Sequence, residues 1–132
     1  MKGYAINIEQ ETLANTNFRK VLYTGKHSQL VLMNLLPNEE IGLESHPDND
    51  QFFRFEKGQG KCIIDDNEYL VSDGFAIIVP AGAQHNVINM STTEGLKLYT
   101  IYSPANHLDG IVRATKAEAE SNDPEFDGVT TE

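Results

Sequence analysis

Four side chains are spaced so that they can meet at one metal ion. Glu44 and His46 lie two residues apart in an apolar run, so both point to the same face of a strand. Gln51 opens the next run, on the face that also carries alternating phenylalanines, and His85 opens a later run after a tight Pro-Ala-Gly corner. Phenylalanines that share a face indicate a barrel interior. We therefore expect Glu44, His46, Gln51 and His85 to converge on one internal cavity.

This set of side chains predicts a divalent metal site. Imidazole nitrogens from His46 and His85 with the carboxylate of Glu44 form the ligand set of open non-haem iron centres, and it also suits Mn, Zn or Ni. Gln51 adds a neutral amide oxygen as a fourth ligand. Two reaction types follow for a small polar substrate: dioxygen chemistry at Fe(II), or isomerisation with the metal as Lewis acid and Glu44 or Tyr102 as acid and base.

The elements that must position these residues are short strands. Runs rich in Val, Ile, Leu, Phe and Tyr alternate with Gly, Pro, Asn and Asp clusters, which is typical of an all-β sandwich or barrel. Brief helices are expected at Glu9–Asn15 and, capped by Thr115, at Thr115–Glu120. The predicted strands are Tyr4–Ile8, Lys20–Tyr23, Gln29–Leu36, Ile41–His46, Gln51–Lys57, Lys61–Ile64, Tyr69–Val71, Phe75–Val79, His85–Met90 and Leu96–Tyr102.

The chain has the length of one domain. With 132 residues and no internal repeat, we expect a single barrel over residues 1–113, followed at 114–132 by a short helix and an acidic, mobile tail. A net charge of −10 argues against nucleic acid and anionic membranes as partners. The single Cys62 excludes a disulfide framework, and the absence of a signal peptide or a membrane-spanning run favours a cytoplasmic protein.

The run Gln29–Leu36 is apolar on both faces, because Leu30, Leu32 and Leu36 alternate with other large hydrophobics. A strand in an isolated antiparallel barrel normally has one polar face. Its second face must therefore be covered, either by a partner subunit or by the N-terminal segment. On this ground we predict a homodimer.

The spacing around His85 resembles the second motif of the cupin family. That motif runs Gly, five residues, Pro, one, Gly, two, His, three, Asn. Gly74, Pro80, Gly82, His85 and Asn89 match it at every position. The resemblance implies a double-stranded β-helix, or jelly-roll, barrel that holds a divalent metal. The chain also looks like small single-domain cupins that are often labelled mannose-6-phosphate isomerase-like.

The first cupin motif is kept in spacing but altered in residues. Asn38, Glu44, His46, Gln51 and Gly58 stand where the family has Gly, His, His, Glu and Gly. Asn in place of Gly is a mild change, since Asn tolerates positive φ. The other two changes replace a metal histidine by a carboxylate and the metal glutamate by a neutral amide, and loss of that anion weakens metal affinity.

Other readings of the same residues remain open. The barrel can be a non-catalytic module that binds or senses a small molecule through a degenerate metal site, or a purely structural dimer. Asp48 is a fallback ligand if its loop folds inward, although a turn role fits it better. Tyr99 and Tyr102 alternate in face, so one of them lines the cavity, and His107 is placed to fold over the barrel mouth.

Overall fold

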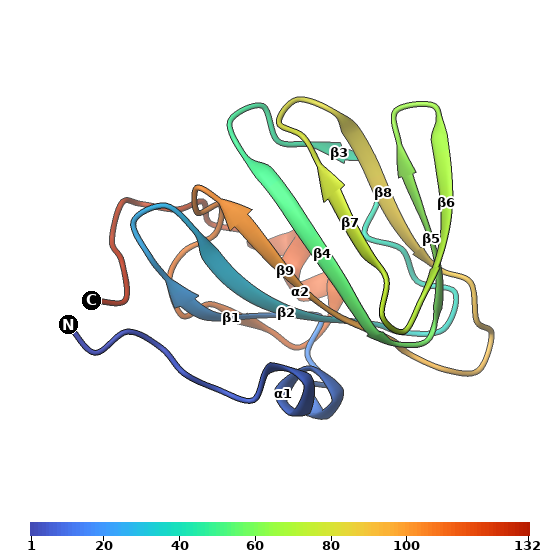
Figure 1. Ribbon diagram of the computed structural model, residues 1–132, viewed down its shortest axis with the longest axis horizontal. Helices are drawn as coiled ribbons and strands as arrows, with labels where there is room; N and C mark the ends of the chain where they lie inside the picture. The colour runs from blue at the N-terminus through green and yellow to red at the C-terminus, as the bar shows by residue number, and fades with distance from the viewer.

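The computed structural model describes all 132 residues and shows two facing antiparallel sheets with a short helix near each end (Figure 1). This confirms the all-β jelly-roll class. The larger sheet has the order β10-β1-β2-β9-β4-β7 and the smaller β3-β8-β5-β6. The elements are α1 Ile8–Ala14, β1 Arg19–Thr24, β2 Gln29–Leu35, β3 Glu44–Ser45, β4 Asp50–Lys57, β5 Gln59–Ile64, β6 Asn67–Ser72, β7 Ala76–Val79, β8 Gln84–Asn89, β9 Leu96–Ser103, β10 Val112–Arg113 and α2 Lys116–Ser121.

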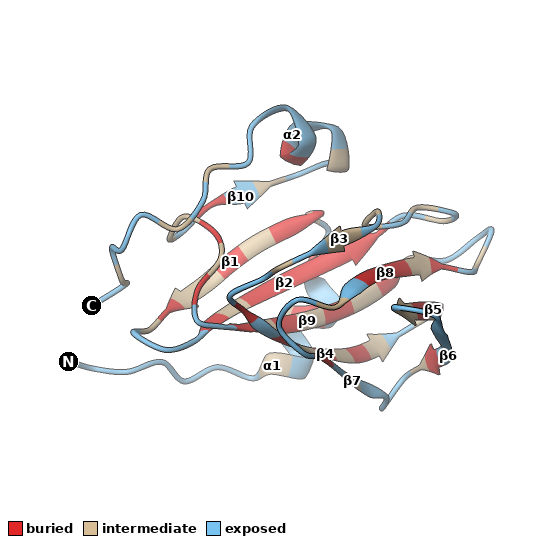
Figure 2. Cartoon of the chain, turned by 90° about the horizontal axis from the view of Figure 1, so that it is seen from above, coloured by how far each residue is buried: buried red, intermediate tan, exposed pale blue.

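The barrel interior is apolar at one end and polar at the other. Met33, Leu98 and Phe55 lie opposite one another across the larger sheet and form the apolar end. Four residues further along these strands, the row contains Tyr102 and Gln51 instead, and both are buried. The buried residues follow β2, β9 and β8, as Figure 2 shows. Buried polar groups need partners, so the polar end is where a ligand site is expected.

Two motif residues hold the barrel's turns rather than a ligand. Gly58 has φ of +107°, and a Cβ there would lie 2.7 Å from the carbonyl oxygen of Gly95, so a side chain does not fit. The amide of Asn89 donates to the carbonyl oxygens of Leu35, Leu36 and Glu94. These bonds tie β8 to two neighbouring loops, which explains a fixed Asn in this position.

Three strand predictions need correction. Tyr4–Ile8 is not a strand, because the Asn7 side chain accepts a hydrogen bond from the Gln10 backbone and starts helix α1 at Ile8. The strand predicted over Ile41–His46 shrinks to β3, since Gly42 at φ +102° interrupts pairing with β8. Strand β10 was not predicted at all. The helix expected at Glu9–Asn15 and the remaining strands are confirmed, with ends shifted by at most two residues.

The second face of β2 is partly covered by the chain itself. Helix α1 packs on β2, β9 and β4, and beneath it Leu32 on β2 is only 1% exposed. The N-terminal segment thus supplies part of the cover that the two-faced strand required. A second subunit is not needed at Leu32, and the homodimer stays a prediction.

The C-terminal segment, expected to be a mobile tail, lies along the barrel. Thr115 caps α2 as predicted, by accepting a hydrogen bond from the Glu118 backbone. After α2 the chain runs back past the open end of the barrel, where Thr131 donates to the Thr24 carbonyl and Tyr23 donates to Glu132. Polar side chains anchor this segment, which hydropathy does not reveal. Neither helix is long and apolar enough to cross a membrane.

Candidate metal centre

Strand β3, the residue that follows it and strand β8 bring Glu44, His46 and His85 together. Glu44 lies directly opposite His85 in the β3–β8 pair, and His46 follows two residues after Glu44 on the same face. Glu44 Oε1 is 3.3 Å from His46 Nε2 and 3.3 Å from His85 Nε2. One ligand atom from each of the three residues lies within 4.8 Å of the others. The convergence expected for Glu44, His46 and His85 is therefore present.

Both imidazoles present a nitrogen with no hydrogen-bond partner. The Nε2 atoms of His46 and His85 are buried, and neither forms a hydrogen bond despite its contact with Glu44. Nδ1 of His85 lies 3.3 Å from the carbonyl oxygen of Ala83. Because a carbonyl oxygen only accepts, that Nδ1 carries a hydrogen, and in the neutral imidazole the lone pair is then on Nε2. A buried lone pair without a partner is what a metal ligand requires.

Glu44 supplies negative charge at neutral pH. Burial by itself would raise the pKa of Glu44, but its contacts with His46 and His85 outweigh burial and lower that pKa to about 2. The carboxylate is therefore ionised over the physiological range. It is the one anionic group among the candidate ligands, and it offsets part of the charge of a divalent ion.

Gln51 is buried in the same polar end of the barrel. Its side chain is oriented by Nε2, which donates to Thr100 Oγ1 at 3.0 Å. The amide oxygen, Oε1, is buried and has no hydrogen-bond partner. An oriented but unsatisfied oxygen fits the predicted role of a neutral ligand, and it equally fits an acceptor for a bound water or hydroxyl group.

A tyrosine and a histidine line the interior beside these groups. Tyr102 faces inward and is 2% exposed, whereas Tyr99 lies on the outer face. The Tyr102 ring lies edge-on to His46, with centroids 5.6 Å apart. His107 Nε2 is 3.2 Å from the Tyr102 hydroxyl, so His107 does fold over the barrel mouth. Burial, with a smaller contribution from Glu44, raises the pKa of Tyr102, so Tyr102 is a neutral phenol.

The sequence did not point to Arg19 and Asp123, two charged residues near this site. It suggested Asp48 as a fallback ligand, and Asp48 lies outside the site. Asp123 Oδ1 contacts both Arg19 Nη1, at 3.2 Å, and His107 Nδ1, at 3.3 Å. The position of Arg19 could have been predicted, because Arg19 lies two residues before buried Val21 on the same, inward face of β1. No such pattern points to Asp123. Asp48 is exposed and does not belong to the group of Glu44, His46 and His85.

The distance from Glu44 to each imidazole fits a metal ion. A tetrahedral ion with bonds of about 2.1 Å separates its ligand atoms by roughly 3.4 Å, and the two Glu44–imidazole distances are both 3.3 Å. Two imidazoles and one carboxylate leave at least one position for water or substrate. Residues present in the chain therefore suit a metal with an open coordination site.

The cupin domain model matches residues 31–102 of the 132-residue chain. The chain is a member of the cupin family. Protein BH2720 of Bacillus halodurans, a crystal structure, superimposes with a TM-score of 0.89 at 42% identity, over 92% of this cupin and 96% of that chain. The matched segment contains Glu44, His46, Gln51, His85 and Tyr102, so the whole candidate centre belongs to the shared barrel.

Two relatives of this cupin have no described activity. Uncharacterized protein L612 of Acanthamoeba polyphaga mimivirus is 44% identical over 88% of this chain and 74% of its own length. Uncharacterized protein YrkC of Bacillus subtilis is 48% identical over 89% of this chain and 66% of its own length. Both relatives are longer than the part that matches this chain.

Proposed function

We propose that this cupin binds one divalent metal ion through Glu44, His46 and His85 and is a metal-dependent enzyme acting on a small polar metabolite. The observation that carries the proposal is the pair of buried Nε2 atoms, without hydrogen-bond partners, on either side of an ionised carboxylate. Leaving such polar atoms unsatisfied destabilises a fold, and a bound cation removes that cost. Gln51 is a further ligand in this proposal.

The protein's own groups suggest how a substrate is handled. A metal in this centre would polarise a carbonyl or hydroxyl group, or support dioxygen chemistry if it is iron. His107 Nδ1–H donates a hydrogen bond to Asp123, which leaves Nε2 to accept a hydrogen bond from the Tyr102 hydroxyl. Tyr102 is thereby held with its oxygen lone pairs free, which suits an acid–base role in isomerisation.

A second candidate is a barrel that binds or senses a metabolite without turnover. Gln51 favours it, because a neutral amide stands where the cupin motif has a charged ligand, so metal is held less firmly. The dioxygenase and sugar (phosphate) isomerase types are the two alternatives within the enzyme proposal. A substrate screen separates the two functions: turnover that disappears in H46A and H85A supports the enzyme, and substrate binding without turnover supports the sensor.

Metal content of the purified protein tests the proposal directly. Protein prepared without chelators should contain close to one equivalent of Fe, Mn, Zn or Ni by elemental analysis. H46A and H85A remove one of the three strong donors each, so we expect at least about a tenfold loss of affinity. H27A is the matched control, since His27 is exposed and does not belong to the group of Glu44, His46 and His85.

The control variant should keep its metal. Circular dichroism and thermal unfolding show whether each variant is folded. A wild-type protein that takes up no stoichiometric metal, even after incubation with each of the four ions, would disprove the proposal. Equal metal loading of H46A, H85A and the wild type would disprove the ligand assignment.

A further inference from the structure

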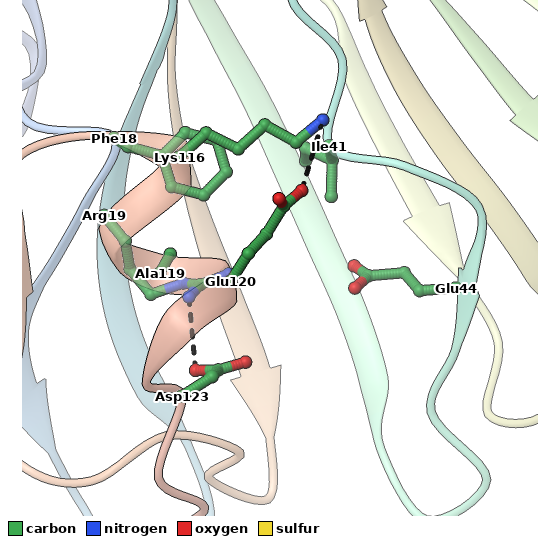
Figure 3. A pocket seen from close by; sticks show the side chains of 8 residues that line it. All are labelled: Phe18, Arg19, Ile41, Glu44, Lys116, Ala119, Glu120 and Asp123. Atoms are coloured by element: carbon green, nitrogen blue, oxygen red, sulfur yellow. Dashed lines mark hydrogen bonds and ion pairs between the residues drawn. The ribbon is translucent and has the colours of Figure 1, made fainter.

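A pocket of about 210 Å³ lies between helix α2 and the metal centre (Figure 3). Glu44 points into it from β3, and Arg19, Lys116, Glu120 and Asp123 lie on the opposite side. Phe18, Ile41 and Ala119 form its apolar walls. Glu44 thus belongs both to the metal centre and to this pocket, so a molecule in the pocket reaches the metal centre.

Arg19 is the unusual member of this lining. Its side chain is only 7% exposed, and the guanidinium stacks over the Phe18 ring at 5.4 Å. A guanidinium has five N–H donors, and Arg19 makes one side-chain hydrogen bond, from Nη1 to Asp123. Nε is buried with no acceptor. Nε itself is closed off from the pocket, so the donors left for a ligand are the remaining N–H groups of Nη1 and Nη2.

The charged groups around Arg19 indicate that its remaining donors suit an anion. Asp123 is shared between Arg19 and His107, so it neutralises the guanidinium incompletely. Lys116 is already 3.7 Å from Glu120 on the next turn of α2. Burying an incompletely neutralised arginine is costly, and an anion that accepts from the terminal N–H groups of Arg19 would offset part of this cost.

We propose that this pocket binds the carboxylate of a small substrate through Arg19, with the rest of the substrate directed at Glu44 and the metal. The proposal extends the proposed function by naming the substrate class. A planar guanidinium matches a planar carboxylate with two parallel hydrogen bonds. The pocket is smaller than the roughly 300 Å³ at which sites for drug-sized ligands begin, so the substrate is a metabolite of few atoms.

A carboxylate fits this pocket better than a phosphate does. A phosphate dianion carries more charge and needs several donors, whereas the carboxylates of Glu44, Glu120 and Asp123 line the pocket and repel a second negative charge. The arrangement offers one free guanidinium face. Inorganic phosphate is therefore the discriminating comparison.

Calorimetric titration of the zinc-loaded protein with malonate tests the proposal, with malonamide and inorganic phosphate as comparison ligands. Malonate should bind at least tenfold more tightly than malonamide or phosphate. Arg19→Gln should weaken malonate binding at least tenfold while leaving zinc content unchanged. Arg54→Gln, on the outside of the barrel, is the matched control and should bind malonate normally. Glu120→Gln should strengthen malonate binding several-fold, because it removes a repelling charge and releases Lys116.

Two further measurements test the proposal even if the Arg19→Gln variant does not fold. Arg19→Lys keeps the charge but loses the planar group that donates two parallel hydrogen bonds, and should bind malonate with intermediate affinity. In the wild type, the Arg19 Nε–H signal in ¹H–¹⁵N NMR should shift on addition of malonate and stay unchanged with malonamide. Malonate binding that is unaffected in folded Arg19→Gln, or an unmoved Nε–H signal, overturns the proposal.

The outcomes separate this inference from the metal proposal. Stoichiometric zinc with no Arg19-dependent malonate binding refutes the carboxylate pocket alone. If the protein takes up no metal, the same titration is made on the metal-free chain. Arg19-dependent binding there upholds the pocket and refutes only the metal-dependent enzyme, whereas its absence refutes both.

Discussion

Gln51 is the one candidate ligand that offers neither a carboxylate nor an imidazole. Its Nε2 is used by Thr100, and its Oε1 is buried without a partner. A neutral oxygen contributes less to cation affinity than an anion does, because the number of charged ligands strongly tunes affinity. At the residue scale, therefore, the strength of metal binding should depend on this one amide.

Replacing Gln51 by Glu should strengthen metal binding. The variant adds a second carboxylate beside Glu44, and the Thr100 hydroxyl can donate to it in place of accepting from the amide. We expect zinc or manganese affinity to rise at least about tenfold, measured by competition with a chromophoric chelator. Q51A is the control, with stoichiometric metal but affinity at or below the wild-type value. Weaker binding by Q51E than by the wild type would contradict a ligand role for this position.

At the scale of elements, the C-terminal segment completes the polar end of the barrel. Asp123 follows α2 and contacts Arg19 on β1 and His107 after β9. Hydrogen bonding to His107, together with Arg19, lowers the pKa of Asp123 despite burial. Burial lowers the pKa of His107, and this outweighs the opposing effect of Asp123. The docked segment therefore places an ionised Asp123 beside a neutral His107.

This pair predicts a pH dependence of stability. The folded state favours neutral His107, so its pKa is below the ordinary value of about 6.5. As pH falls through about 6.5, the unfolded chain takes up a proton that the folded chain resists, and the free energy of unfolding falls. Urea unfolding of metal-free protein at pH 7.5 and 5.5 should show a larger loss for the wild type than for H107N.

The comparison isolates one histidine among the four in the chain. H27N is the control and should lose as much stability between the two pH values as the wild type, because His27 is exposed. If H107N and the wild type lose equal free energy of unfolding, the neutral state assigned to His107 is wrong.

At the scale of the whole molecule, one outer face of the larger sheet remains apolar. Leu30, Ile101, Phe52 and Ile78 lie opposite one another on four neighbouring strands. Helix α1 covers the sheet at Leu32 but leaves Ile78 67% exposed at the edge strand β7. An outward row of large hydrophobics across a sheet is typical of an interface. This row is now the stronger basis for the predicted homodimer.

Sedimentation velocity at tens of micromolar tests the dimer. The wild type should sediment at twice the 14.7 kDa chain mass. Ile78→Asp places a charge in the row and should shift the protein to monomer. Leu70→Asp is the matched control, because Leu70 is 73% exposed on β6 of the other sheet, and it should remain dimeric. A wild-type monomer excludes the dimer, and a dimeric Ile78→Asp excludes this face.

What could be predicted from the sequence is local in origin. Alternation with period two depends only on neighbouring backbone geometry, so it identified the strands and placed Glu44, His46 and His85 on inward faces. The same logic placed Gln51 and Phe53 inside, and both are buried. It did not extend to Tyr4–Ile8, where a side-chain cap at Asn7 overrode an apolar run.

The tertiary structure decided which distant polar residues meet. Arg19 and Asp123 are 104 positions apart, and no local pattern marks Asp123, which lies in a polar stretch like many others. Their pairing depends on how the C-terminal segment crosses the barrel mouth, and that path follows from the shape of the assembled sheets. The sequence alone thus determined the fold and the metal ligands to test, whereas the carboxylate pocket became visible only once chain ends and strands were brought together in space.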